Sequence, residues 1–168
     1  MLYVCSLSKL QQTTEETGAK TLVTLISDGT QVDRPASIES NDHLFLAFND
    51  IIEPMEGMTP PGVDHVEALI DFGRKWDRTA PMVVHCWAGI SRSTAGAYII
   101  GCARNPDIDE EVLATELRAA SPSATPNARL VAFADEILGR NGRMVDAIRR
   151  IGRGASAYEG SPFMLDIE

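Results

Sequence analysis

The residues most suited to chemistry in this chain of 168 residues are Cys86 and Arg92, which enclose a stretch of five residues. Just before the cysteine, Val83 and Val84 form a β-branched apolar run, which is typical of a strand buried on both faces. From Ser91 to Ile100 the sequence indicates a helix. A strand, a tight loop and a helix in this order direct loop N–H groups and a helix N-terminus at one point, where a phosphate-like anion can bind.

Cys86 and Arg92 complement each other in such a loop. The helix N-terminus and the guanidinium both favour the thiolate form of the cysteine, which is the nucleophilic form. The guanidinium also presents a planar fork that matches two phosphate oxygens, and a buried arginine at a helix N-terminus opposes the helix dipole unless an anion is bound. The pattern therefore predicts a nucleophile and an anion site in one loop. The alternative for Cys86 is an inert thiol at the end of a core strand.

The local sequence HCWAGISRS, residues 85–93, resembles the HCxxGxxRS signature loop of the cysteine-dependent protein tyrosine phosphatases, and it matches every fixed position. The resemblance implies that Cys86 attacks the phosphorus atom, that His85 orients the loop, and that the Ser93 hydroxyl helps the sulfur to leave. It also assigns the binding of the substrate phosphate to Trp87, Ala88, Gly89, Ile90, Ser91 and Arg92.

Three of these residues have structural alternatives. Alternatively, Ser93 is a first-turn helix residue with a local hydrogen bond, and His85 is a core histidine with its hydrogen bonds satisfied. Trp87 lies either at the rim of the pocket or under the loop.

The same resemblance implies an aspartate on a mobile loop, which protonates the leaving oxygen. The matching loop, residues 49–62, follows an expected strand and begins with Asn-Asp, so Asp50 is the candidate acid. Alternatively, Asp50 only starts a turn. The other candidate acids are Glu53, Glu56 and Asp64, of which Asp64 is first of all a residue of a helix N-terminus.

A second stretch, SPSATPNARL at residues 121–130, resembles the turn before the last core helix of dual-specificity phosphatases. There an asparagine supports the signature loop, and Asn127 occupies that place; alternatively, Asn127 is a first-turn helix residue. The resemblance covers roughly residues 1 to 140 and favours the compact dual-specificity type. The interior of the signature loop contains no lysine, which makes inositol phosphates less expected as substrates.

Composition narrows the class of protein. The net charge is −9, which disfavours general affinity for nucleic acid or anionic membranes. The three cysteines form no CxxC spacing, which favours a reducing compartment over a disulfide scaffold or a zinc site. No apolar run reaches membrane-spanning length, and the polar N-terminal stretch does not fit a signal peptide, so we expect a cytoplasmic protein. The expected reaction requires no metal or other cofactor.

Two features concern the cysteines and arginines outside the signature loop. We expect Cys102 to lie too far along the helix to pair with Cys86, whereas Cys5 could pair with it only if its strand neighbours the central strand. Five arginines gather near the C-terminus, either as a docking patch for an acidic partner or as a solvated helix face. They are Arg140, Arg143, Arg149, Arg150 and Arg153.

Strand and helix patterns alternate along the first two thirds of the chain, which predicts an α/β fold with a mostly parallel sheet flanked by helices, as in dual-specificity phosphatases. The expected strands are residues 2–5, 20–26, 43–48 and the run at Val83 and Val84. The expected helices are residues 8–17, 63–77, 91–100, 109–120, 126–138 and 142–151. Their predicted N-caps include Ser6 or Ser8, Asp109 and Thr125, and Gly18 is the predicted stop of the first helix. We expect one catalytic domain, residues 1–151, followed by a loose tail, residues 152–168.

These expectations combine into a phosphatase that hydrolyses phosphotyrosine, with phosphoserine and phosphothreonine as further candidates, through a phosphocysteine intermediate. Its partners would be phosphorylated proteins or small phosphate esters. Two alternatives belong to other classes: a rhodanese-like sulfurtransferase, which also places a cysteine in an anion-binding loop, and a non-catalytic module that recognises phosphorylated partners.

Overall fold

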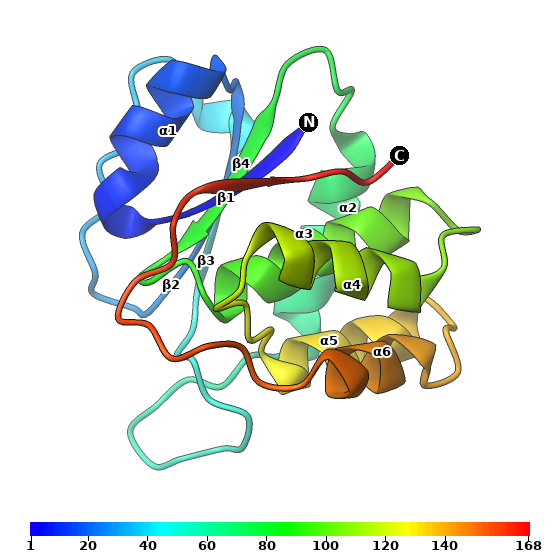
Figure 1. The fold of residues 1–168 in the computed structure, drawn as a ribbon. Helices are drawn as coiled ribbons and strands as arrows, with labels where there is room; N and C mark the ends of the chain where they lie inside the picture. Colours follow the sequence, from blue (N-terminus) through cyan, green and yellow to red (C-terminus); the bar gives the residue numbers. More distant parts are fainter.

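The computed structural model describes residues 1–168, which form a five-stranded sheet and six α-helices (Figure 1). The strands are β1 (Leu2–Ser6), β2 (Thr21–Ile26), β3 (His43–Ala47), β4 (Met82–Cys86) and β5 (Phe163–Leu165). The helices are α1 (Leu10–Thr17), α2 (Val63–Lys75), α3 (Arg92–Arg104), α4 (Glu110–Ala120), α5 (Ala128–Ile137) and α6 (Arg143–Ile151), with short 3₁₀ helices at Leu7–Lys9 and Ser40–Asp42.

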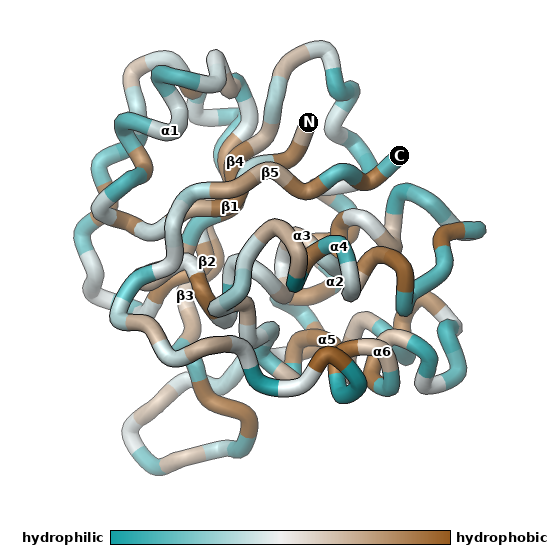
Figure 2. Tube along the Cα trace, in the orientation of Figure 1, coloured by the Kyte–Doolittle hydropathy of each residue, from teal (hydrophilic) through white to brown (hydrophobic).

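The sheet has the strand order β3-β2-β4-β1-β5, in which only the edge strand β5 is antiparallel. All five residues of β4 are buried, as expected for the central strand of a parallel sheet. Figure 2 shows apolar residues along these central strands. Helix α1 covers one face of the sheet, and the other helices gather on the opposite face (Figure 1). The predicted α/β fold with a mostly parallel, helix-flanked sheet is confirmed.

The helix ends confirm some of the predicted signals and correct others. Gly18 ends α1 in the left-handed conformation (φ 68°), and the Asp109 side chain caps α4 by accepting hydrogen bonds from two backbone N–H groups. The prediction of Thr125 as the N-cap of α5 is wrong. Asn127 holds that position, because its side-chain oxygen accepts from the N–H groups of Arg129 and Leu130.

The prediction of a loose C-terminal tail is also wrong. Residues Phe163–Leu165 form β5, which pairs with the otherwise open edge of β1. Phe163 and Leu165 are buried, whereas Met164 between them is exposed, as expected for a strand that covers a core on one face. Three residues are too few for this alternation to be recognised in the sequence. The open edge of β1 gives the segment its hydrogen-bond partners.

The segment that leads to β5 is attached to the N-terminal part of the chain. The Ser6 and Ser8 hydroxyl groups donate hydrogen bonds to the Glu159 carboxylate. Ser6 holds the N-cap position of the 3₁₀ helix Leu7–Lys9, which leads into α1, but its side chain makes no capping hydrogen bond. Of the two predicted N-caps, Ser6 is therefore confirmed in position but not as a side-chain cap, and Ser8 is wrong because it lies within the 3₁₀ helix.

The five arginines near the C-terminus do not form one surface. Arg140 is buried and forms an ion pair with Glu110, with Nη1 2.8 Å from Oε1, and its Nη2 donates to the carbonyl oxygens of Cys102 and Asn105. Arg140 therefore connects the segment between α5 and α6 to α3 and α4, while Arg143, Arg149, Arg150 and Arg153 are exposed. No helix of the protein combines the length and the apolar character that crossing a membrane requires.

Candidate active site

The fold places Cys86 and Arg92 at the carboxyl end of the central strand. Strand β4 ends at Cys86, and α3 begins at Arg92, so residues 87–91 form the connecting loop that we call the signature loop. Ligands of open parallel sheets bind beyond the carboxyl ends of the strands. The signature loop therefore occupies the position at which an α/β sheet of this kind binds its ligand.

The carbonyl groups of the signature loop are bound from outside by other segments. Four backbone hydrogen bonds do this: Leu7 N–H donates to Trp87 O (3.0 Å), Gly160 N–H to Ala88 O (2.8 Å), Thr125 N–H to Ile90 O (2.9 Å) and Asn127 N–H to Ser91 O (3.2 Å). The N–H groups of residues 87–91, in contrast, donate no hydrogen bond within the protein. A trans peptide directs its N–H opposite to its C=O. The free N–H groups are thus turned away from the bound carbonyls, and such an arrangement can hold an anion.

Gly89 is required by the backbone of this loop. Its φ of 72° lies in the left-handed region, which favours glycine. A Cβ atom at this position would also lie 2.9 Å from the backbone carbon of Cys5 and from the backbone nitrogen of Ser6. A side chain here would therefore push the loop away from β1.

Cys86 and Ser93 lie in direct contact beneath the loop. Both are buried, and the Cys86 Sγ lies 3.0 Å from the Ser93 Oγ, within hydrogen-bond distance. As a thiol the sulfur donates to the hydroxyl, and as a thiolate it accepts from it. The Ser93 side chain can thus stabilise negative charge on the sulfur.

Arg92 is only 6% exposed, and its guanidinium is partly unpaired. Its Nη1 donates to the Phe48 carbonyl oxygen (2.9 Å) and to the Ser27 hydroxyl (3.1 Å), whereas its buried Nε has no partner. A buried N–H group without an acceptor is unfavourable, and more so when it belongs to a cation. An oxygen of a bound anion would satisfy it.

His85 is completely buried behind Cys86 and forms one end of a hydrogen-bonded chain. Burial lowers the pKa of His85 to about 4, so the ring is neutral and carries a single N–H. The Nδ1 lies 3.1 Å from the carbonyl oxygen of Cys86, which can only accept, so Nδ1 is the donor. The Nε2 then accepts from the Thr24 hydroxyl at 2.8 Å, and the Thr24 oxygen accepts from Nε2 of His43 at 2.8 Å.

Thr24 and His43 were not predicted as part of the site. They come from β2 and β3, and Thr24 lies directly opposite His85 in the sheet. The only sequence signal is a polar residue in each of two apolar strand runs, which gives no indication of their register.

Asp50 and Asn127 meet at the other side of the signature loop. The Oδ1 of Asp50 accepts hydrogen bonds from the Ser91 hydroxyl (2.8 Å) and from Nδ2 of Asn127 (2.9 Å). Asn127 Nδ2 also donates to the carbonyl oxygen of Ile51 at 3.2 Å. Asn127 thus reaches the signature loop through its backbone N–H and the acid-bearing loop through its side chain.

The other candidate acids are arranged differently. Glu53 and Glu56 are exposed on the loop of residues 49–62, and Asp64 lies in the first turn of α2. None of the three forms a hydrogen bond with the signature loop, so the structure brings only Asp50 to it.

Cys5 lies on the strand next to Cys86 but on the opposite face of the sheet. In the pairing of β1 with β4, Cys5 is opposite His85, whereas Ser6 is opposite Cys86. Residues paired in this way point to the same face, and neighbours along a strand point to opposite faces. Burial raises the pKa of the Cys5 thiol to about 12. This placement argues against a disulfide between Cys5 and Cys86.

Neither protein-family models nor curated protein sequences gave a match to this chain. Solved structures, however, are similar to it. The PTP-2 phosphatase of Cydia pomonella has a TM-score of 0.62 and 20% identity, over 80% of this chain and 84% of that one. Human DUSP28 has a TM-score of 0.61 and 17% identity, over 83% and 89% of the two chains.

A third similar structure is described as a phosphatase-like protein. The human tyrosine phosphatase-like serine/threonine/tyrosine-interacting protein has a TM-score of 0.60 and 16% identity, over 83% of this chain and 92% of that one. These similarities cover about four fifths of this chain. The chain therefore has the fold of the compact dual-specificity and tyrosine phosphatases.

Proposed function

We propose that the protein is a phosphatase that hydrolyses phosphotyrosine in proteins, with phosphoserine and phosphothreonine as further substrates, through a phosphocysteine intermediate. One observation supports this most strongly. Beside Cys86, the N–H groups of residues 87–91 and the buried Nε of Arg92 have no partner within the protein. A nucleophile therefore lies next to a set of donors suited to a dianionic phosphate.

In the first step, the loop N–H groups and Arg92 hold the phosphoryl oxygens, and the Cys86 thiolate attacks phosphorus in line with the leaving oxygen. The sulfur–phosphorus bond forms as the phosphorus–oxygen bond breaks, and the electron pair goes to the leaving oxygen. Asp50 gives that oxygen its proton, so that a neutral hydroxyl departs. The hydrogen bonds from Ser91 and Asn127 to Asp50 support this assignment, because they hold the carboxyl group at the edge of the signature loop.

In the second step, water attacks phosphorus while the Asp50 carboxylate takes its proton. The sulfur–phosphorus bond breaks, the pair returns to sulfur, and inorganic phosphate is released. The Ser93 hydroxyl, 3.0 Å from the sulfur, donates a hydrogen bond to the departing thiolate. The neutral His85 contributes by holding the Cys86 carbonyl, which fixes the start of the loop.

A non-catalytic phosphate-binding module is the second candidate, because one similar structure is described as an interacting protein. Catalysis is favoured over it because Cys86, Arg92, Ser93 and Asp50 are all present, with Ser93 in contact with Cys86 and Asp50 hydrogen-bonded to Ser91 of the signature loop. The rhodanese-like alternative has no such support, since sulfur transfer needs no acid at the position of Asp50.

Hydrolysis of p-nitrophenyl phosphate in EDTA between pH 5 and 8 tests the proposal, with the Cys86→Ser and Asp50→Ala variants measured in parallel. We expect turnover by the wild type and none by Cys86→Ser. Asp50→Ala should lose more activity on a phosphotyrosine peptide than on the aryl ester, whose leaving group needs less protonation.

Two results would contradict the proposal. Binding of vanadate without turnover would assign the protein to the phosphate-binding modules. Transfer of sulfur from thiosulfate to cyanide, without phosphatase activity, would assign it to the sulfurtransferases.

A further inference from the structure

A groove extends from the candidate active site to the C-terminal helices. Its first part, a cavity of about 760 Å³, is lined by Asp50, Ser91 and Asn127. Its second part, a cavity of about 770 Å³, lies between the loop of residues 49–62, α5 and α6. The two parts share wall residues, among them Ile52, Thr125 and Pro126, so they form one continuous groove. We call the second part the α5–α6 groove.

The wall of the α5–α6 groove is largely apolar. Phe133 comes from α5, Val145 and Ile148 come from α6, and Ile52 comes from the loop of residues 49–62. Ile52 is 59% exposed, which is unusual for a large aliphatic side chain. Met55 and Met58, on the same loop, are exposed as well. Figure 2 shows this loop extending beyond the body of the molecule with an apolar stretch.

Three arginines line the same groove, although the chain as a whole is acidic. Arg129 is held in place, with its Nε donating to the Pro61 carbonyl oxygen at 2.7 Å and its guanidinium 4.9 Å from the centre of the Phe133 ring. Arg149 is exposed and has only a distant ion pair with Asp146, at 3.9 Å. Arg153 forms no ion pair.

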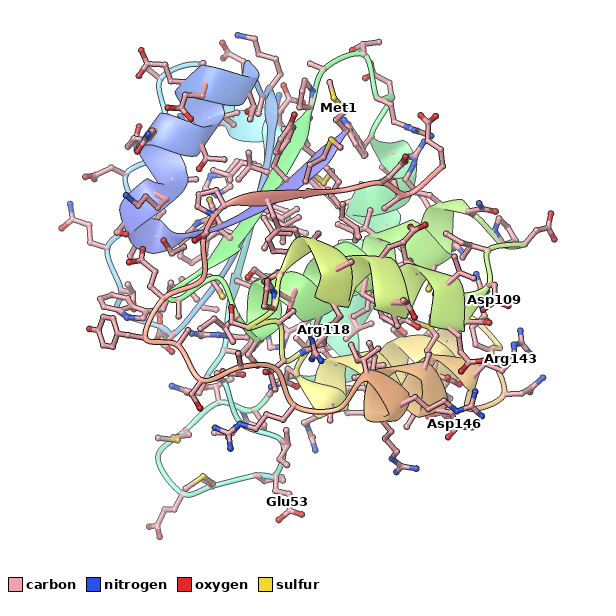
Figure 3. The ribbon with its side chains drawn as sticks, viewed as in Figure 1. Met1, Glu53, Asp109, Arg118, Arg143 and Asp146 are labelled. Carbon is pink, nitrogen blue, oxygen red and sulfur yellow. The ribbon has the colours of Figure 1, made fainter.

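The acidic residues near the groove do not cancel this charge. Glu53 is the single acidic residue that lines the α5–α6 groove, and in Figure 3 its side chain points away from α5 and α6. Asp146 on α6 contributes only its 3.9 Å contact with Arg149, and Arg143 on the same helix pairs with Glu110. An apolar wall bordered by Arg149, with its single distant ion pair, and by Arg153, with none, is complementary to a chain segment that combines an apolar side chain with carboxylates.

We propose that the α5–α6 groove binds the polypeptide segment next to the phosphorylated residue of the substrate. An apolar side chain of that segment packs against Phe133 and Ile148, and its acidic side chains face Arg149 and Arg153. The groove starts at the residues that hold Asp50, so a chain leaving the phosphate site can enter it directly. This inference rests on the proposed phosphatase activity and adds the substrate class: phosphoproteins with apolar and acidic residues beside the phosphorylation site.

The experiment compares kcat/KM of the wild type and of the double variant Arg149→Gln/Arg153→Gln on three kinds of substrate. They are p-nitrophenyl phosphate, a phosphotyrosine peptide with leucine and two glutamates beside the phosphotyrosine, and the same peptide with lysines in place of the glutamates. Each peptide is made in two versions, with the leucine and the two charged residues either before or after the phosphotyrosine, so that both directions along the groove are sampled. Arg150→Gln is the matched control, because Arg150 is on the same helix but pairs with Glu111 outside the groove.

We expect the wild type to prefer the glutamate peptide over the lysine peptide, with the difference in KM. The double variant should lose about three- to tenfold in kcat/KM on the glutamate peptide, as expected for two partly exposed ion pairs. It should hydrolyse p-nitrophenyl phosphate with the same kcat/KM as the wild type, because this small ester does not extend into the α5–α6 groove. Arg150→Gln should leave all three rates unchanged, and added salt should reduce the preference of the wild type.

The outcomes separate the inference from the function on which it rests. If the wild type hydrolyses p-nitrophenyl phosphate but treats both peptides alike, the groove inference is wrong and the proposed function stands. If the wild type hydrolyses none of the substrates, both fail. Loss of binding to phosphatidylserine vesicles in the double variant, with unchanged peptide kinetics, would assign the groove to a membrane surface and overturn the inference.

Discussion

Asn127 connects the candidate acid with the framework, so its replacement gives a specific prediction. Its side chain has two separate tasks: Oδ1 caps α5, and Nδ2 donates to Asp50 at 2.9 Å and to the Ile51 carbonyl. Asn127→Ala removes both. Loss of the cap should lower the free energy of unfolding by about 1 kcal/mol.

The effect on catalysis follows from the second task. A hydrogen bond to a charged group contributes about 1.5 to 3 kcal/mol. Because Asp50 is exposed and keeps its 2.8 Å hydrogen bond from Ser91, we take the lower end. About 1.5 kcal/mol corresponds to roughly a tenfold fall in kcat on a phosphotyrosine peptide. The loss on p-nitrophenyl phosphate should be smaller, since that leaving group depends less on the acid.

Asn127→Asp separates the two tasks. The introduced carboxylate retains the cap of α5, because aspartate is as effective as asparagine at this position. It removes the donor and places a negative charge next to Asp50. We therefore expect a smaller loss of stability than in Asn127→Ala, with at least as large a fall in kcat. Urea unfolding gives the stability, and steady-state kinetics give kcat.

The double variants with Asp50→Ala decide whether Asn127 acts through Asp50. Without Asp50 the peptide rate should already be about 10²- to 10⁴-fold lower, and Asn127→Ala should add little to that loss. If Asn127→Ala lowers kcat tenfold in both backgrounds, Asn127 acts on the signature loop itself, and the positioning role is refuted.

Three further predictions concern other parts of the site and of the core. Arg92→Lys should lower kcat/KM on p-nitrophenyl phosphate by roughly 10²- to 10³-fold in steady-state kinetics, because an ammonium group cannot replace the planar N–H donors of the guanidinium. A variant with the kcat/KM of the wild type would contradict this role of Arg92. The pKa of His85 lies below its ordinary value of 6.5, at about 4, so the unfolded chain takes up the proton first as the pH falls. The contribution of neutral His85 to the free energy of unfolding is therefore complete above pH 6.5 and decreases by about 3 kcal/mol towards pH 4. Urea unfolding at pH 7 and at pH 4.5 should show that the free energy of unfolding decreases less in His85→Gln than in the wild type. Arg140→Met leaves the buried Glu110 carboxylate with Arg143 as its only ion-pair partner and should lower the free energy of unfolding by about 3 kcal/mol. The double variant Arg140→Met/Glu110→Met should recover part of this loss. An Arg140→Met variant as stable as the wild type in urea unfolding would contradict the prediction.

Much of the site was predictable because its parts are local. The proposed nucleophile Cys86, the loop N–H groups and Arg92 lie within residues 86–92, and a strand followed by a tight turn and a helix fixes their relation. The placement of Asp50 beside the signature loop was predictable for a similar reason, since parallel strands end at the same edge of a sheet and Asp50 lies three residues after the end of β3. The strands at 20–26 and 43–48 were expected within one residue of their observed ends, Thr21–Ile26 and His43–Ala47, because their apolar runs end at polar residues.

What the tertiary structure decided depends on contacts between distant segments. The chain from His43 through Thr24 to His85 exists only because β2 lies between β3 and β4 in one register, which no local pattern encodes. The arginines near the C-terminus look alike in the sequence, yet packing buries Arg140 against Glu110 and leaves Arg149 and Arg153 along a groove.

The chain by itself thus determined the arrangement of groups on which the proposed chemistry rests, because Cys86, Arg92 and the loop backbone belong to one short segment. Only the folded structure decided which distant side chains support the loop, how β5 closes the edge of β1, and where a substrate chain could continue. The physical reason is that hydrophobic burial and strand pairing act between residues far apart in sequence, and their register follows from the packing of the whole domain.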